Sequence, residues 1–110
     1  MHVISRKKLI EFGRDHPEAV VPLDVWYRAA RKALWLSLNA VKEQFPHADP
    51  VGECVVFNIG GNKYRLIVRI VYAARPRPGR RQFKGRVYVL HVLTHKDYDS
   101  GKWKADCGCE

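Results

Sequence analysis

A ten-residue segment with alternating side chains, residues 63–72, constrains most strongly what this chain can fold into. Its even positions are all apolar, whereas its odd positions include Lys63, Arg65 and Arg69. Successive side chains of a β-strand point to opposite faces of a sheet, so this period of two predicts a strand with one buried face. The other face then carries three cations over about 20 Å, at about 6.6 Å for each two-residue step.

Two further segments around this strand are apolar and complete a small sheet. Residues 54–59 precede it, and the Gly-Gly-Asn sequence at residues 60–62 predicts a turn because these residue types tolerate positive φ. Residues 86–93 are nearly all apolar, which predicts a central strand. A loop rich in Pro, Gly and Arg, residues 73–85, joins the second and third strands.

Before residue 50 the apolar spacing is typical of helices. Ser5 can cap a first helix that runs to about Arg14. His16-Pro17 ends it, because a residue that precedes proline avoids the helical region. A second helix begins near Pro22, which suits a first helical turn. Ser37 or Asn39 can cap a third helix that ends at about residue 45.

Helices followed by strands define an α+β fold class, in which the N-terminal helices pack on an antiparallel sheet of three to four strands. A chain of 110 residues has room for one core, so we expect a single domain over residues 1–110. Its helical part covers residues 1–46, its sheet covers residues 53–94, and residues 100–110 form a C-terminal tail.

The charge of the chain is strongly one-sided. Its 20 Lys and Arg residues against 11 acids give a formal net charge of +9. No acid occurs between Cys54 and Lys96, whereas a surface shaped only by solubility would intersperse both signs. This pattern indicates a polyanionic partner, which could be a nucleic acid, an anionic membrane surface or an acidic protein. The alternative is a basic surface without such a partner.

The sequence contains no apolar run near 18 residues, and charges interrupt residues 1–14. We therefore expect neither a transmembrane helix nor a secretory signal. Cys107 and Cys109 are too close together for the usual zinc pair. We expect a buried Cys54 thiol and two tail thiols in a reducing cytoplasm, with no metal and no cofactor.

Residues 94–99, directly after the last predicted strand, combine an imidazole (His95), an amine (Lys96), a phenol (Tyr98) and two carboxylates. Strand ends commonly carry functional groups because a rigid scaffold positions them. The alternative is structural, since an aspartate here can cap a turn and Tyr98 can pack into the core. The presence of Arg65 on the polar face of a nearby strand favours the functional interpretation.

These groups suit the cleavage of RNA by transesterification. The reaction needs a base for the 2′-hydroxyl, a cation for the pentacoordinate phosphate and an acid for the leaving 5′-oxygen. An imidazole changes protonation near neutral pH and a guanidinium binds phosphate bidentately, so His95 and Arg65 fit two of these roles. RNA supplies its own nucleophile, so the reaction requires no metal. A two-metal nuclease built on the carboxylates stays open as an alternative.

Two motifs resemble the HigB family of bacterial toxin–antitoxin toxins. One is N-x-G-G-N-x-x-R at residues 58–65, and the other is T-H-x-x-Y-D at residues 94–99. Residues 41–46, with Ala48 and Asp49, are also similar to the segment that precedes the first strand in that family. The resemblance covers most of residues 1–99 and implies a RelE/ParE-like fold of N-terminal helices on a small antiparallel sheet.

The resemblance also implies a function and partners. HigB toxins are ribosome-dependent mRNA endonucleases that halt translation, and a HigA antitoxin with a helix-turn-helix domain neutralises each of them. The complex typically represses its own operon, so we expect contact with operator DNA only through the antitoxin. Two alternatives share the scaffold: a ParE-like gyrase inhibitor, and a non-catalytic RNA- or ribosome-binding module.

Carried onto this sequence, the resemblance implies a catalytic site of Arg65, His95 and Tyr98. Arg65 would hold the scissile phosphate, and His95 or Tyr98 would move protons, with the order of base and acid left open. Contacts to the RNA backbone are expected from Lys63, Arg69, Lys96, Arg75, Arg77, Arg80 and Arg81.

The chain departs from the family pattern at two places. The loop at residues 73–85 is longer and richer in arginine than a tight hairpin, and it can add contacts to ribosomal RNA. The tail at residues 100–110 has no counterpart in the resemblance, and its Trp103 can stack on a base or dock a partner.

Overall fold

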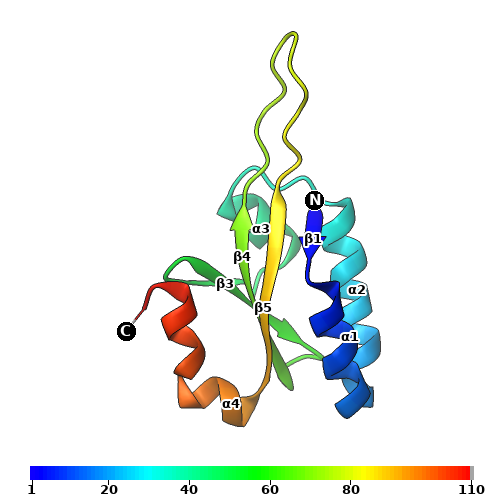
Figure 1. Cartoon of the computed structure of the whole chain (residues 1–110), viewed down its shortest axis with the longest axis vertical. Helices are drawn as coiled ribbons and strands as arrows, with labels where there is room; N and C mark the ends of the chain where they lie inside the picture. Colours follow the sequence, from blue (N-terminus) through cyan, green and yellow to red (C-terminus); the bar gives the residue numbers. More distant parts are fainter. Residues whose placement is uncertain (110) are drawn as a thin grey trace.

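The computed structural model describes residues 1–109 and has the predicted α+β architecture (Figure 1). Its helices are α1 (Arg6–Asp15), α2 (Val20–Lys32), α3 (Leu38–Gln44) and α4 (His95–Ser100), with short 3₁₀ turns η1 (Pro17–Ala19) and η2 (Lys102–Cys107). Its strands are β1 (His2–Ile4), β2 (Asp49–Val51), β3 (Cys54–Ile59), β4 (Tyr64–Val71) and β5 (Arg86–Thr94). The bounds of β3, β4 and β5 confirm the three predicted strands.

The strands within residues 1–109 form one five-stranded sheet in the order β1-β5-β4-β3-β2. β1 is parallel to β5, and the other neighbouring strands are antiparallel. β5 lies inside the sheet, which agrees with its apolar sequence. The prediction of three to four strands missed β1 and β2, because edge strands of 3 residues are too short to show a period.

The even face of β4 packs against the helices and forms the main core. Tyr64, Leu66 and Val68 are buried there with Trp26 of α2 and Phe57 of β3. The Trp26 and Phe57 rings meet edge to face with their centroids 5.5 Å apart, which is a favoured aromatic geometry. The alternation at residues 63–72 therefore predicted the buried face of the central strand.

The predicted helix starts have different outcomes. The Ser37 hydroxyl caps α3 by accepting a hydrogen bond from the Ala40 N–H at 3.3 Å, as predicted. Ser5 precedes α1, but its side chain makes no capping bond, and its main-chain oxygen accepts the Lys8 N–H at 3.0 Å instead. Helix α2 begins at Val20, two residues before the predicted proline, because η1 leads directly into it.

The C-terminal segment covers the odd face of β4 and builds a second, smaller core. Ile67 packs there with Trp103 and with a disulfide between Cys54 and Cys107. The prediction of free thiols at these two positions is wrong. The cysteines lie 53 residues apart and meet only because η2 folds back against β3, which their spacing in the sequence does not reveal. Cys109 keeps a free thiol.

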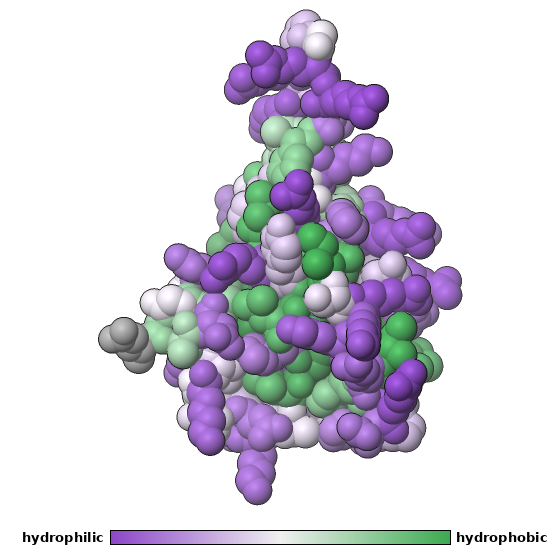
Figure 2. All heavy atoms as spheres, viewed as in Figure 1, coloured by the Kyte–Doolittle hydropathy of each residue, from purple (hydrophilic) through white to green (hydrophobic). Residues whose placement is uncertain are grey.

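The loop at residues 73–85 projects from the end of the sheet where β4 finishes and β5 begins (Figure 1). At its base the Ala74 N–H donates to the Phe83 carbonyl at 3.0 Å. Beyond this point the loop is hydrophilic (Figure 2). Its exposed arginines are Arg75, Arg77, Arg80 and Arg81.

An apolar groove with a volume of about 440 Å³ lies between α1 and α2. Val21 and Val25 line it and are 70% and 61% exposed, and Arg6 and Arg14 also line it. These side chains leave part of the helical layer apolar and uncovered. None of the helices in residues 1–109 combines the length and the apolar character needed to cross a membrane.

Candidate active site

Two segments that are distant in the sequence meet at one end of the sheet. Tyr64 at the start of β4 pairs with Thr94 at the end of β5, so the turn before β4 and helix α4 leave the sheet side by side. The Thr94 hydroxyl caps α4 by accepting the Asp97 N–H at 3.3 Å. Residues 94–99, for which the sequence predicted a function, therefore begin at the cap of α4 and continue into this helix. They lie beside the Gly-Gly-Asn turn at residues 60–62.

Arg65 and His95 converge on Asn62. The Arg65 guanidinium donates to the Asn62 main-chain oxygen at 3.2 Å, to its side-chain Oδ1 at 3.3 Å and to the Tyr64 carbonyl at 3.2 Å. The His95 Nε2 contacts the same Asn62 main-chain oxygen. A carbonyl oxygen only accepts, so this contact assigns the hydrogen to Nε2 and leaves Nδ1 of the neutral ring with a lone pair.

Tyr98 joins this pair from the same helical turn as His95. The Arg65 guanidinium carbon lies 5.3 Å from the centre of the Tyr98 ring, within the range of a cation–π contact. The Trp103 ring stacks on Tyr98 at 5.1 Å, with 14° between the planes. The structure thus brings all three predicted catalytic residues together, as a guanidinium, an imidazole and a phenol that are at least partly exposed.

Tyr64 anchors the start of β4 from the opposite face. Its phenol donates to the Glu18 carboxylate of η1, and its ring meets the Phe12 ring edge to face at 5.3 Å. The hydrogen bond from Tyr64 lowers the pKa of Glu18, and the same bond, together with burial, raises the pKa of Tyr64. These contacts fix the strand end from which Arg65 projects.

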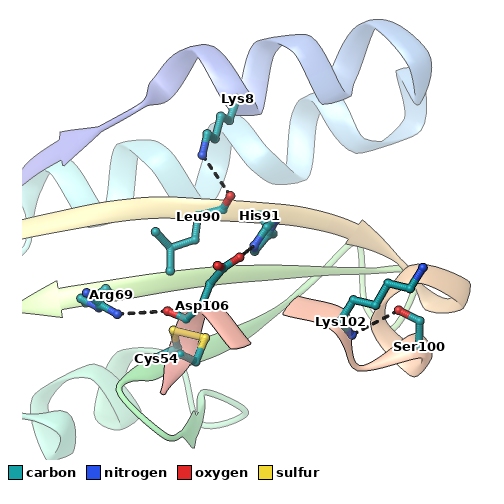
Figure 3. Close-up of polar contacts among 9 residues, drawn as sticks. Lys8, Cys54, Arg69, Leu90, His91, Ser100, Lys102 and Asp106 are labelled. Carbon is teal, nitrogen blue, oxygen red and sulfur yellow. Dashed lines mark hydrogen bonds and ion pairs between the residues drawn. A yellow bond between two sulfur atoms is a disulfide. The ribbon is translucent and has the colours of Figure 1, made fainter. Parts of the chain in front are cut away.

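The remaining cations predicted on this part of the chain have different surroundings. Lys63 in the turn and Lys96 on α4 are exposed in the segments that hold the three converging residues. Arg69 lies further along β4, where it pairs with Glu53 at 3.0 Å. It also donates to the Asp106 carbonyl at 3.0 Å, as Figure 3 shows. Arg69 therefore contacts the C-terminal segment instead of facing the Arg65 cluster.

The loop arginines lie at the opposite end of the sheet. The loop leaves β4 after Val71, whereas Arg65 is at the start of that strand. An 8-residue strand spans roughly 23 Å, at about 3.3 Å for each residue step. The structure therefore separates Arg75, Arg77, Arg80 and Arg81 from Arg65, His95 and Tyr98 by about the length of β4.

Sequence reasoning missed two residues of this site. The Gly-Gly-Asn sequence places Asn62 only in a turn, although the position of this residue in the N-x-G-G-N-x-x-R motif, three residues before Arg65, could indicate the contact. Trp103 is 3% exposed and stacks on Tyr98, so the expectation that it is free to stack on a base or to dock a partner is wrong. Nothing in the composition of the tail indicated this burial.

The arrangement can bind an anion through Arg65 and exchange protons through His95 and Tyr98. Among residues 1–109, no three His, Cys, Asp or Glu side chains are grouped so that they could hold a metal ion. A basic α+β domain with helices on a mostly antiparallel sheet is consistent with the class of RelE-like toxins.

The chain belongs to the HigB toxin family, described as the RelE-like toxic component of a toxin–antitoxin system, and matches it over residues 19–101. It is 26% identical over 102 residues to the mRNA interferase toxin HigB of Escherichia coli K12, which covers 90% of this chain and 88% of that protein. The mRNA interferase HigB proteins of Escherichia coli O157:H7 and Shigella flexneri match with the same identity and coverage. The resemblance seen in the sequence motifs is confirmed, and membership implies an antitoxin partner.

Proposed function

We propose that this chain is a ribosome-dependent mRNA endonuclease that inhibits translation. Three relatives that cover 90% of the chain are named as mRNA interferases, which supports this proposal. The observation that carries it is the convergence of Arg65, His95 and Tyr98 around Asn62. A guanidinium, an imidazole and a phenol match the cation, base and acid that RNA transesterification needs.

In the proposed reaction, the 2′-hydroxyl oxygen attacks the adjacent phosphorus and the bond from phosphorus to the 5′-oxygen breaks. Arg65 stabilises the charge that develops on the phosphoryl oxygens. The His95 Nδ1 lone pair makes this residue the candidate base for the 2′-hydroxyl proton, and the Tyr98 phenol is the candidate acid for the leaving oxygen. The products are a 2′,3′-cyclic phosphate and a 5′-hydroxyl, and the step consumes no metal or cofactor.

RNA binding is proposed at two regions. Lys63 and Lys96 lie beside the catalytic residues and would contact the backbone close to the scissile phosphate. Arg75, Arg77, Arg80 and Arg81 would contact phosphates near the far end of β4, where ribosomal RNA is the candidate ligand. Arg69 would take part only if its exposed face can reach RNA while it keeps its contacts to Glu53 and Asp106.

For the partner, we propose a HigA-type antitoxin with a helix-turn-helix domain, through which alone the complex contacts operator DNA. The groove between α1 and α2 is the proposed docking surface, because Val21 and Val25 are uncovered there. Its charged lining residues are Arg6, Arg14 and Asp24, and the chain has a net charge of +9. An apolar antitoxin segment with acidic flanks complements this surface, whereas a second copy of the chain would bring like charges together.

The deciding experiment follows mRNA in a translating extract by mapping 5′ ends. Arg65→Ala and His95→Ala should each reduce cleavage by about a hundredfold or more, because a positioned acid, base or phosphate-binding group typically contributes on that order. Both variants should still sediment with ribosomes. Arg31→Ala and His47→Ala are matched controls at exposed positions outside the site, and they should cleave normally.

The alternatives give different results in the same extract. A non-catalytic ribosome binder would inhibit translation without producing new 5′ ends. A ParE-like gyrase inhibitor would leave mRNA intact and change the supercoiling of a plasmid. Either result with purified wild-type protein would overturn the proposed function.

A further inference from the structure

The C-terminal turn η2 buries two side chains, Trp103 and Cys107, although it lies outside the part of the chain that matches the family. The match ends at residue 101, and η2 covers Lys102–Cys107. Trp103 is 3% exposed and Cys107 is fully buried against Cys54, Val56 and Ile67. A segment beyond the matched residues therefore completes the second core of this protein, together with side chains of β3 and β4.

Trp103 contacts Tyr98 in two ways. The indole ring stacks on the phenol ring at 5.1 Å, and the indole Nε1–H donates to the Tyr98 main-chain carbonyl at 2.9 Å. A stacked ring limits rotation of the side chain, and the hydrogen bond fixes the backbone of the same residue. Together they restrain both the position and the orientation of Tyr98.

Apart from Trp103, helix α4 is held by the contact of His95 with the Asn62 main-chain oxygen and by the cation–π contact of Tyr98 with Arg65. It is 6 residues long and contributes no fully buried side chain. Isolated helices shorter than about 12 residues are marginal in water, so such a helix depends on tertiary contacts. Trp103 contributes the largest buried side chain next to Tyr98, so the orientation of α4 depends on where η2 places this indole.

Three kinds of contact fasten η2 to the sheet, and Figure 3 shows the disulfide and the contacts of Asp106. The Cys54–Cys107 disulfide joins it covalently to β3. Asp106 contacts His91 through its carboxylate at 2.7 Å and accepts from Arg69 through its main-chain oxygen at 3.0 Å. The Glu53 N–H donates to the Cys107 carbonyl at 2.8 Å. The disulfide is the strongest of these links, because it alone persists when hydrogen bonds open.

We propose that Trp103 is a positioning residue for the Tyr98 phenol and that the Cys54–Cys107 disulfide holds Trp103 in place. Trp103 acts through Tyr98 and does not touch RNA. This inference rests on the proposed role of Tyr98 in RNA cleavage. It follows that a dithiol reductant slows cleavage: two electrons and two protons pass from the dithiol to the disulfide, which yields two cysteine thiols and an oxidised dithiol.

The first test compares single-turnover cleavage of ribosome-bound mRNA at saturating toxin. Trp103→Ala should lower the rate about tenfold to a hundredfold, because small misplacements of a catalytic group cost on that order. Trp103→Phe keeps a ring that can stack and should recover part of the rate. Trp35→Phe is the matched control: Trp35 is also 3% exposed and also donates through Nε1, to Gln44, but it belongs to the main core. Its rate should stay within twofold of wild type.

A double-mutant cycle distinguishes positioning from a general loss of stability. In the Tyr98→Ala background, Trp103→Ala should cost no more than twofold, because the side chain through which Trp103 acts is absent. If Trp103→Ala lowers the cleavage rate in the Tyr98→Ala background as much as it does in the wild-type background, the indole does not act through Tyr98. All rates are measured below the melting temperature of each variant.

A measurement without RNA separates this inference from the proposed function. The ring protons of Tyr98 should resonate upfield in the NMR spectrum of the wild-type protein because of the stacked indole. They should move downfield in Trp103→Ala but not in Trp35→Phe. If the shift is present and no RNA is cleaved, the proposed function fails while the restraint on Tyr98 holds; if it is absent, the positioning inference fails.

The redox part is tested on the wild-type protein with dithiothreitol. Complete reduction, verified by thiol labelling, should slow cleavage at least fivefold, and reoxidation should restore the rate. Cys109→Ser should respond like wild type, because Cys109 lies outside the disulfide. A fully reduced protein that cleaves at the wild-type rate would contradict the role of the disulfide.

Discussion

The Arg65 guanidinium and the His95 imidazole donate to one atom, the main-chain oxygen of Asn62. This shared acceptor sets the distance between the two groups, because both are tied to the same point of the turn before β4. A main-chain oxygen survives any side-chain substitution. The turn therefore holds the cation and the imidazole together by its backbone, while the Asn62 side chain adds one further bond to Arg65.

Asn62→Ala should weaken cleavage moderately. The substitution removes the 3.3 Å contact from Arg65 to Oδ1 but keeps the main-chain acceptor. One such hydrogen bond contributes about 1 kcal/mol, so the cleavage rate should fall about fivefold. Asn39→Ala, at an exposed position on α3, is the control and should leave the rate unchanged. A loss as large as that of Arg65→Ala would mean that the side chain, rather than the backbone, organises the site.

The roles of His95 and Tyr98 are separable with a modified substrate. A sulfur in place of the bridging 5′-oxygen makes a leaving group that needs no protonation. If Tyr98 is the acid, Tyr98→Phe should cleave this RNA at close to the wild-type rate, whereas His95→Ala should remain slow. The measurement is the ratio of rates on the sulfur and oxygen substrates. If the sulfur substrate restores the rate of His95→Ala but not that of Tyr98→Phe, His95 is the acid and Tyr98 is the base.

The loop arginines should control binding and not chemistry. Arg77→Ala or Arg80→Ala should weaken ribosome binding about equally for all transcripts, because phosphate contacts carry no sequence information. Each lost contact should reduce the slope of log K against log salt by about 0.7 to 0.9. The cleavage rate at saturation should not change. Arg31→Ala serves as the comparison, and a changed rate at saturation would place the loop in the catalytic step.

Introducing negative charges into the groove between α1 and α2 should prevent the antitoxin from binding. Val21→Asp with Val25→Asp places two carboxylates on the apolar surface that the antitoxin is proposed to cover. Co-purification with the cognate antitoxin should be lost while mRNA cleavage persists. Val71→Asp is the control, at a partly exposed valine outside the groove. If the doubly substituted protein still co-purifies with the antitoxin, this groove is not the docking surface.

The contribution of the bond between Tyr64 and Glu18 should depend on pH. The phenol lowers the pKa of Glu18, so the folded state binds the proton less tightly than the unfolded chain does. The stabilisation is complete above the ordinary glutamate pKa of about 4.3 and is lost as the pH falls through the lowered value. The difference in unfolding free energy between wild type and Tyr64→Phe should therefore shrink in acid. Denaturant titrations at neutral and acidic pH measure it, and Tyr88→Phe should show no such trend.

The residues of the site that long strands position could be predicted from the sequence. The period of two at residues 63–72 assigned Leu66 to the core and Arg65 to the opposite face, and both assignments hold. Antiparallel pairing of β4 with β5 then required the residues after Thr94 to lie beside the turn before Tyr64. The convergence of Arg65 and His95 follows from register, which a strong hydrophobic pattern sets.

The features that escaped prediction depend on contacts between distant segments. The Cys54–Cys107 pair needs η2 to fold back over β3, and no local pattern encodes that turn. The burial of Trp103 follows from the same fold. Ser5 failed for a different reason: its backbone has a φ of 73°, which a rule based on residue type does not anticipate. Propensities describe local chemistry, whereas tertiary packing decided the outcomes for Cys54, Cys107 and Trp103.

The length of β4 has a consequence for how the protein would select its substrate. With phosphate-binding groups at both ends of a strand that spans roughly 23 Å, a ligand long enough to reach both regions binds the second one as an intramolecular event. Short oligonucleotides would occupy only one of the two regions and would therefore compete weakly with longer RNA. Longer ligands would bind more tightly because the second region is already at a high effective concentration. The length of the RNA, rather than its base sequence, would therefore decide whether it stays bound.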